Sequence, residues 1–235
     1  MKKNFNFMSA KTMAILMFPA FVMVSSCKDD DDSTPAPTPT YAKVMVTHAS
    51  PDAPGVDLLV DNVKLNSAAL TFPSNTPYIT LGTGNRNVKI NVSGTSTTVI
   101  NATLPLVANK NYSVFAIDSV ASIDALVIED NLAAPAAGKA HVRFIHLSPD
   151  APSVDVAVDG AAVVFGDYSY EEYSAFTPLD AGTYDLEVRV AGTSTVALDL
   201  DPITLQAGKI YTVFAKGFLG GTGTQALGAQ IIVNN

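Results

Sequence analysis

The sequence reads His48-Ala49-Ser50-Pro51-Asp52-Ala53-Pro54-Gly55-Val56-Asp57 at one point and His146-Leu147-Ser148-Pro149-Asp150-Ala151-Pro152-Ser153-Val154-Asp155 at another. We call each of these stretches the motif. A spacing of roughly one hundred residues is too long for one unit of a solenoid or propeller, and it is long enough for each copy to close its own core. The duplication therefore predicts two similar domains in tandem.

The chain around each motif alternates between apolar and polar residues. Before the first motif, Val46 and His48 share one face of the expected strand and Met45 faces the other way; in the second copy Arg143 takes the place of Met45. A period of two marks a half-buried strand rather than a helix. The same alternation recurs in 87–92 and 186–190.

Each copy contains about seven or eight such short segments, separated by turn residues and without helical periodicity. We therefore predict an all-β fold with two tandem antiparallel β-sandwich domains of immunoglobulin/transthyretin-like type. Because the segment between the copies is apolar and uncharged, the domains are expected to pack against each other. The predicted boundaries are 1–26 for a lipoprotein signal peptide, 27–40 for a lipidated cysteine, acidic run and Pro/Thr linker, 41–131 for repeat 1, 132–138 for an interdomain linker and 139–235 for repeat 2.

The N-terminus has the pattern of a secretory signal peptide. Lys2, Lys3 and Lys11 form a basic start, and 13–24 form an apolar run. As a helix this run would span about 18 Å, which is short of the ~30 Å hydrocarbon core of a bilayer. The segment is therefore expected to be removed rather than to cross the membrane.

Val24-Ser25-Ser26-Cys27 follows the apolar core of the signal and resembles the lipobox of bacterial lipoproteins. The resemblance implies that the Cys27 sulfur receives a diacylglyceryl group, with palmitate among the acyl chains, and that Cys27 becomes the mature N-terminus. Cys27 is the single cysteine of the chain, so lipidation also accounts for a lone thiol in a secreted protein. We predict that this N-terminal lipid anchor makes the membrane a partner of the protein.

An acidic run at 29–32 comes almost directly after Cys27. It resembles the export signal of lipoproteins in glycan-scavenging Gram-negative bacteria, which implies a protein exposed on the surface of the cell outer membrane. The alternative is a solvated acidic spacer. The Pro/Thr segment 33–40 extends about 25 Å as polyproline II and is expected to hold the domains clear of the bilayer.

The charge of the chain excludes one class of partner. The net charge is −8, and the signal peptide carries lysines but no acidic residue, so its removal makes the balance more negative. Such a chain lacks the basic surface that nucleic-acid binding needs. No glycine-rich phosphate loop leads into a helix, and no cofactor is predicted.

The motif supplies polar candidates for a site. A serine nucleophile needs a base within hydrogen-bond reach, but residues two apart on a strand are about 7 Å apart. Their spacing also matches none of the stronger metal-binding patterns. We assign no catalytic or metal residue, and a hydrolase or metal-dependent enzyme is the less favoured alternative. The candidates are His48, Ser50, Asp52 and Asp57 in repeat 1 and His146, Ser148, Asp150 and Asp155 in repeat 2.

We interpret the motif as a corner that shapes the backbone, because each proline lacks an N–H donor and ends the strand. Asp52 is expected to accept a hydrogen bond from the amide of Gly55, and Asp150 from that of Ser153. The serines are expected to bond within the same turn. Each histidine, on the apolar face, should be neutral and should bond to a carbonyl or carboxylate.

A second candidate lies in an aromatic and acidic segment of repeat 2. Two of its three tyrosines replace apolar residues of repeat 1 and are expected to be packed, whereas Tyr173 replaces Asn75. Exposed tyrosines beside carboxylates stack on sugar rings and bond to hydroxyl groups. The segment is therefore our candidate ligand edge, made by Tyr168, Tyr170 and Tyr173.

The motif and further parts of both repeats resemble a known family. The motif, the turns 60–62 and 158–160 and the strands 112–116 and 211–215 are similar to domain of unknown function 4397, which occurs in secreted and lipoprotein contexts and is often duplicated. The resemblance covers nearly all of 41–235. It implies a sandwich fold and no activity, because none is assigned to the family.

Together these features predict a cell-envelope lipoprotein that acts as a non-catalytic binding or adhesion module. Its partner would be an extracellular polymer or another envelope protein. The first alternative is a structural envelope component that makes only protein contacts, and the second is the enzyme considered above. The sequence leaves the ligand and the oligomeric state open.

Overall fold

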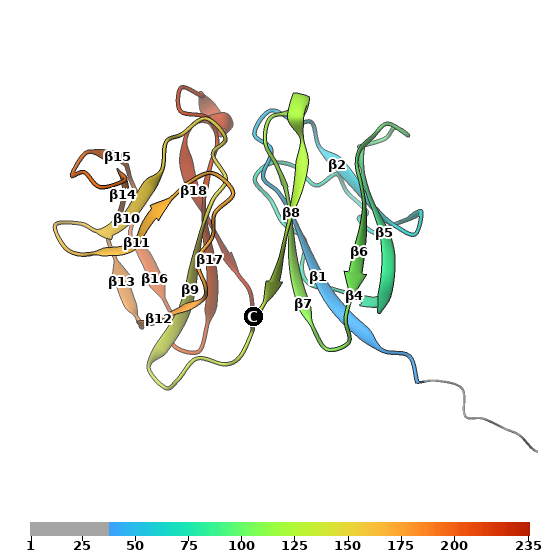
Figure 1. Cartoon of the computed structure of the whole chain (residues 1–235), viewed down its shortest axis with the longest axis horizontal. Helices are drawn as coiled ribbons and strands as arrows, with labels where there is room; N and C mark the ends of the chain where they lie inside the picture. The colour runs from blue at the N-terminus through green and yellow to red at the C-terminus, as the bar shows by residue number, and fades with distance from the viewer. Residues whose placement is uncertain (1–37) are drawn as a thin grey trace, which may run out of the picture. The chain divides into compact units, whose positions relative to one another are not determined.

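The computed structural model describes residues 38–235, and 39–235 form one compact unit (Figure 1). The predicted signal peptide, the lipidated Cys27 and the acidic run lie outside the described residues, as does most of the Pro/Thr linker. Within 38–235, no helix has the length and apolar character needed to cross a membrane.

Repeat 1 forms two four-stranded sheets, with the orders β4-β1-β7-β8 and β3-β2-β5-β6. A short 3-10 turn, η1 (Val120–Ser122), lies between the last two strands. The strands are β1 (Tyr41–His48), β2 (Val56–Val60), β3 (Val63–Lys64), β4 (Ile79–Gly82), β5 (Gly84–Val92), β6 (Thr98–Leu106), β7 (Asn111–Ile117) and β8 (Asp124–Asp130).

Repeat 2 repeats this plan with the orders β12-β9-β17-β18 and β11-β10-β14-β15, and it adds a small β13-β16 sheet. Pro202, which has no N–H donor, lies between β15 and β16, where repeat 1 has the continuous β6. The strands are β9 (Lys139–His146), β10 (Val154–Val158), β11 (Val163–Tyr168), β12 (Thr177–Asp180), β13 (Gly182–Tyr184), β14 (Leu186–Val190), β15 (Val196–Asp199), β16 (Ile203–Leu205), β17 (Ile210–Lys216) and, after the turn η2 (Gly223–Gln225), β18 (Gly228–Val233).

The predicted all-β sandwich fold is confirmed, and the described chain contains no α-helix. One feature differs from a wholly antiparallel sandwich: β1 pairs with β7 in parallel, and β9 pairs with β17 in parallel. The parallel pairing matters for the site. It places the loop that follows β7 or β17 at the same end of the sheet as the motif that follows β1 or β9.

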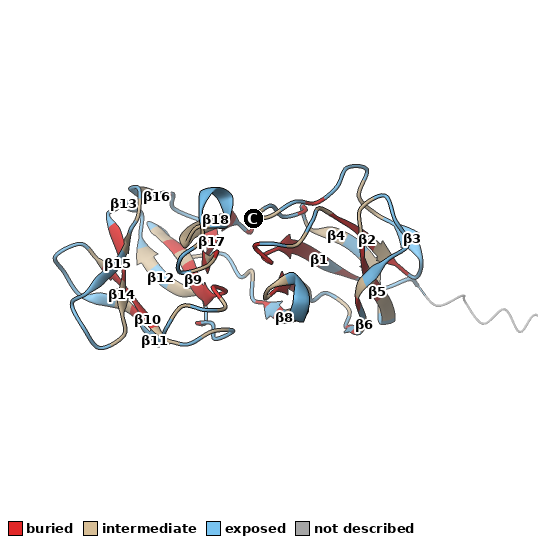
Figure 2. Cartoon of the chain, turned by 90° about the horizontal axis from the view of Figure 1, so that it is seen from above, coloured by how far each residue is buried: buried red, intermediate tan, exposed pale blue. Residues whose placement is uncertain are grey.

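Each repeat closes a hydrophobic core between its own sheets. Val46 on β1 and Val114 on β7 belong to the core of repeat 1, and Phe144 on β9 and Val213 on β17 belong to that of repeat 2. Figure 2 shows the buried segments, coloured red, along β1, β9 and β17. The assignment of residues to the two faces of the first strand of each copy is therefore confirmed. The expectation of half-buried strands is wrong, because 44–48 and 142–146 are buried on both faces.

A third core joins the repeats, and it uses the opposite face of the same strands. Met45 from repeat 1 and Ile145 from repeat 2 are buried in it. At its centre the rings of Phe115 and Phe214 pack edge to face, with centroids 6.0 Å apart. The expectation that the two domains pack against each other is confirmed.

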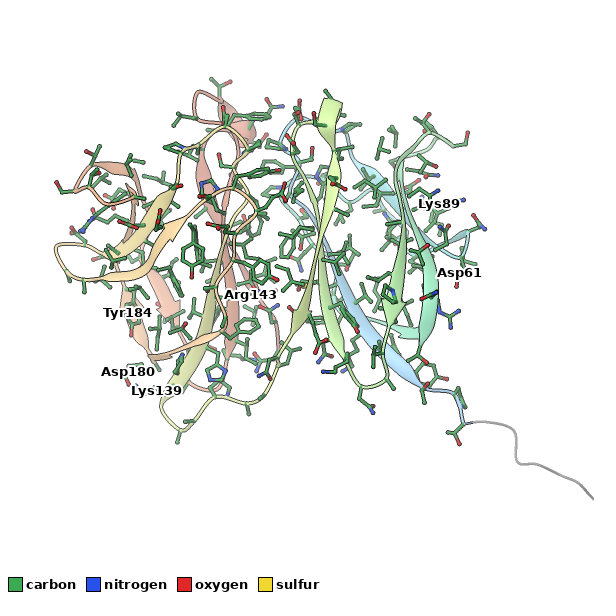
Figure 3. The ribbon with its side chains drawn as sticks, viewed as in Figure 1. Asp61, Lys89, Lys139, Arg143, Asp180 and Tyr184 are labelled. Carbon is green, nitrogen blue, oxygen red and sulfur yellow. The ribbon has the colours of Figure 1, made fainter. Side chains whose placement is uncertain are left out.

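A buried ion pair crosses this third core. The Arg143 guanidinium lies 2.6 Å from Oδ1 of Asp130, and the two side chains are only 2% and 0% exposed. The contact is an ion pair by distance, because no N–H is aligned for a hydrogen bond to that oxygen. In Figure 3 Arg143 lies in the interior, whereas Lys139 and Asp180 of an exposed ion pair lie at the periphery.

Hydroxyl groups from both repeats complete the polar cluster around this pair. Arg143 donates to Oγ of Ser113 at 3.0 Å and to Oγ1 of Thr212 at 2.9 Å. Tyr78 donates to Oδ2 of Asp130 at 2.6 Å. Burial, followed by the charge of Asp130, raises the pKa of Tyr78, so its hydroxyl remains a donor.

The two sides of the interface are equivalent in backbone and different in chemistry. Met45 pairs with Ser113 in the β1–β7 ladder, and Arg143 pairs with Thr212 at the same place in the β9–β17 ladder. By the same comparison, Asp130 of repeat 1 corresponds to Asn234 of repeat 2. One charged pair therefore sits where the symmetric position holds uncharged side chains.

Candidate functional site

The motif histidines end β1 and β9 and point into the cores. His48 is 1% exposed and His146 is 0% exposed. Nε2 of each histidine donates to a proline carbonyl at 3.0 Å, that of Pro54 or Pro152, so the carbonyl partner expected for each histidine is present. Burial lowers the pKa of both rings and keeps them neutral.

The motif aspartates at Asp52 and Asp150 bond to loops distant in sequence. Oδ1 of Asp52 accepts from the amide of Val120 at 2.7 Å, and Oδ1 of Asp150 accepts from that of Leu219 at 2.9 Å. The expectation that Asp52 accepts from the amide of Gly55, and Asp150 from the amide of Ser153, is wrong. The parallel strand beside β1 or β9 brings a competing amide to the carboxylate.

The motif serines are buried and do not bond to the histidines. Oγ of Ser148 donates to the carbonyl oxygen of Gly217 at 2.6 Å, in the loop after β17. The expectation that the serines would bond within the motif turn is therefore wrong. Oγ of Ser50 is buried without a hydrogen-bond partner in the described chain. Each serine therefore lies inside the corner, away from solvent.

The last motif aspartates fix a different pair of turns. Asp57 accepts from the amide of Gly94 at 3.1 Å and lies 2.8 Å from Nζ of Lys64. Lys64 first, and then the Gly94 amide, lower the pKa of Asp57. Asp155 accepts from the amide of Gly192 at 2.9 Å, at the equivalent turn. Both carboxylates thus order a hairpin next to the motif.

These contacts determine what the corner can do chemically. A hydrolytic site needs a serine, a base and an open path for substrate, but His48 and Ser50 are buried and make no bond to each other. Across 38–235, no three His, Cys, Asp or Glu side chains gather into a metal-binding group. The corner is built to hold backbone segments together.

The three tyrosines of the candidate ligand edge have different surroundings. Tyr168 packs on the core of repeat 2, edge to face with Phe144 at 5.7 Å. Tyr170 packs against the third core between the repeats. Tyr173 is 47% exposed. The edge is therefore not a surface of three tyrosines, and only Tyr173 is free to meet a ligand.

Two residues that sequence reasoning missed occupy the ends of the tethered loops. Val120 is 41% exposed and Leu219 is 50% exposed, and the amides of both are the ones held by the motif aspartates. We call the loops 118–123 and 217–227 the tip loops (Figure 1, at the turns after β7 and β17). The signal in the sequence was an aliphatic residue at the same aligned position in both copies.

Both repeats match the model of one protein family. The model of a family described as a domain of unknown function (DUF4397) matches residues 42–157 and 145–235. The chain belongs to the DUF4397 family. The two matches overlap at the second motif and are consistent with a duplicated DUF4397 domain. A search of curated protein sequences gives no match.

Proposed function

We propose that this DUF4397 protein is a lipid-anchored module of the cell outer membrane that binds an extracellular polymer or an envelope protein at its tip loops. The observation that carries the proposal is the tethering of both tip loops by the motif aspartates. A loop without this tether would lose conformational entropy when it binds a partner, and this loss would weaken the affinity. A pre-ordered pair of loops suits recognition.

The position of the tip loops supports the same proposal. Tyr41 begins β1, and the motif begins at His48, the last residue of β1, so about 23 Å of strand separate the linker end from the motif. The tip loops therefore lie at the end away from the linker. A module held on a lipid anchor at Cys27 would present this end to its surroundings.

The second candidate is a structural envelope component that makes only protein contacts. It is favoured by the chemistry of the tip, because Val120 and Leu219 are exposed aliphatic residues. Aliphatic side chains bury well against another protein and offer no hydrogen bond to a sugar. The enzymatic alternative gains no support from the buried histidines.

A pull-down with the purified protein tests the tip. We expect the Val120→Ser/Leu219→Ser variant to lose at least tenfold in capture of the polymer or envelope protein, because each change removes exposed apolar area. The matched control is Val163→Ser, which alters a valine that is 46% exposed on β11. Equal capture by both variants would contradict the tip proposal. A stoichiometric outer-membrane protein in the eluate, with blank glycan arrays, would select the second candidate.

The anchor has its own test. We expect Cys27→Ser to abolish incorporation of labelled palmitate and to move the protein from the membrane pellet to the soluble fraction, because acyl chains need the cysteine sulfur. Ser33→Ala, in the Pro/Thr linker outside the lipobox, is the control and should stay in the pellet. Protease treatment of intact cells then separates surface display from an inward-facing anchor. Pelleting of Cys27→Ser would refute lipid anchoring.

A further inference from the structure

Repeat 2 contains a largely enclosed cavity of about 140 Å³ beside the motif. The atoms that face the cavity are apolar, including those that His146 contributes. The motif itself forms one side through His146, Ala151 and Pro152, and core residues such as Val188 and Leu198 form the other. The family motif therefore borders a space that no contact described above explains.

A comparison of the repeats gives the physical cause of the cavity. Val188 occupies the ladder position of Ile90, and Ala197 is the unpaired residue at the same register shift as Val99. Val188 lacks one methyl group of Ile90, and Ala197 lacks both methyl groups of Val99. Ile90 is 1% exposed and Val99 packs against the core of repeat 1, so the larger side chains use this space in repeat 1.

The tip loop of repeat 2 closes the cavity. Leu219 and Leu227 line it, and the Leu219 amide is tied to Asp150 of the motif. Gly217 and Gly221 let the loop fold back tightly, because a Cβ at either position would collide with backbone carbonyl groups. Ala197 also lines the cavity and is exposed to solvent.

The size and the lining define the chemistry of an occupant. A cavity of about 150 Å³ lined by aliphatic and aromatic side chains stays dry and binds benzene. We infer that the repeat 2 cavity is a binding site for an uncharged apolar group of the size of a benzene ring. A charged or hydroxylated group would lose its water without gaining a hydrogen bond. The inference concerns repeat 2 alone and does not rest on the proposed surface function.

Benzene is the probe for the test. In a two-dimensional amide NMR titration of the purified protein, we expect benzene to shift the resonances of Val154, Val188 and Ala215, which line the cavity. The Val188→Ile/Ala197→Val variant installs the residues that repeat 1 already uses. It should bind benzene at least tenfold more weakly and retain the amide spectrum of a folded protein.

Two further variants make the result decisive. Val163→Ile adds a methyl group at an exposed position of repeat 2 and should bind benzene as the unaltered protein does. Ile90→Val/Val99→Ala opens the equivalent space in repeat 1 and should create a second set of shifts there.

Absence of benzene shifts in the unaltered protein, or equal shifts in a folded Val188→Ile/Ala197→Val variant, would overturn the inference. If that variant does not fold, the repeat 1 variant decides the question. New shifts in repeat 1 would support the inference, and absence of new shifts would refute it. A blank polymer pull-down alone would refute only the surface function.

Discussion

Replacing Arg143 with methionine is expected to lower the free energy of unfolding by about 3–5 kcal/mol. The Arg143 guanidinium and the Asp130 carboxylate are 2.6 Å apart and almost fully buried. Removing one partner leaves the other charge buried without compensation, which costs more than the intact pair contributes. Urea denaturation with linear extrapolation measures the loss.

A second substitution turns this result into a test of the interface. Asp130→Asn on top of Arg143→Met should recover most of the lost stability, because it removes the stranded charge. The protein already holds an uncharged combination, Met45 and Asn234, at the equivalent positions of the other side. The double variant therefore makes the interface symmetric in chemistry as well as in backbone.

The control lies on the same strand as Arg143. Lys139 pairs with Asp180 at 2.8 Å, but the two side chains are 38% and 78% exposed. Lys139→Met should cost about 0–1 kcal/mol, as is usual for exposed ion pairs. A loss below 1 kcal/mol for Arg143→Met, or a double variant as unstable as the single one, would show that the buried charge does not govern this interface.

The strand pattern could be predicted because it depends on local alternation. The predicted strand at 87–92 forms most of β5, and the predicted strand at 186–190 coincides with β14. The partner of Asp52 could not be predicted, because the choice between the nearby Gly55 amide and the distant Val120 amide depends on strand order. A parallel β1–β7 pair leaves no local signal in the sequence.

The surroundings of Arg143 show a second limit. Alternation places Arg143 on the face of β9 opposite Phe144, and an arginine on such a face normally meets water. Here the other repeat covers that face, and the compensating charge, Asp130, comes from another domain. The apolar linker at 132–138 indicates that the repeats pack, but it does not identify which faces meet. Only the fold brings the two charges together.

The buried histidines make stability depend on pH, and stability is expected to fall as the pH drops below 6.5. Burial lowers the pKa of His48 and His146 below the ordinary value of 6.5. Above pH 6.5 both folded and unfolded chains hold neutral rings, and their contribution to stability is complete. Below it the unfolded chain takes up protons that the folded chain excludes. Each histidine then removes about 1.4 kcal/mol per pH unit until the folded pKa is reached, or about 2.7 kcal/mol for both.

Replacing both histidines with glutamine separates this effect from the rest of the titration. A glutamine amide can donate to the same proline carbonyls and does not titrate, so the His48→Gln/His146→Gln variant should unfold in urea with nearly constant free energy from pH 6.5 to 5. The lowered pKa of Asp57 affects stability in a separate window, below pH 3.8. There the unfolded chain protonates this carboxylate while the folded chain still holds it charged, so its contribution to stability is lost as the pH falls. An unchanged slope in the double variant would mean that the motif histidines remain accessible to protons, and the corner would then be open rather than closed around the backbone.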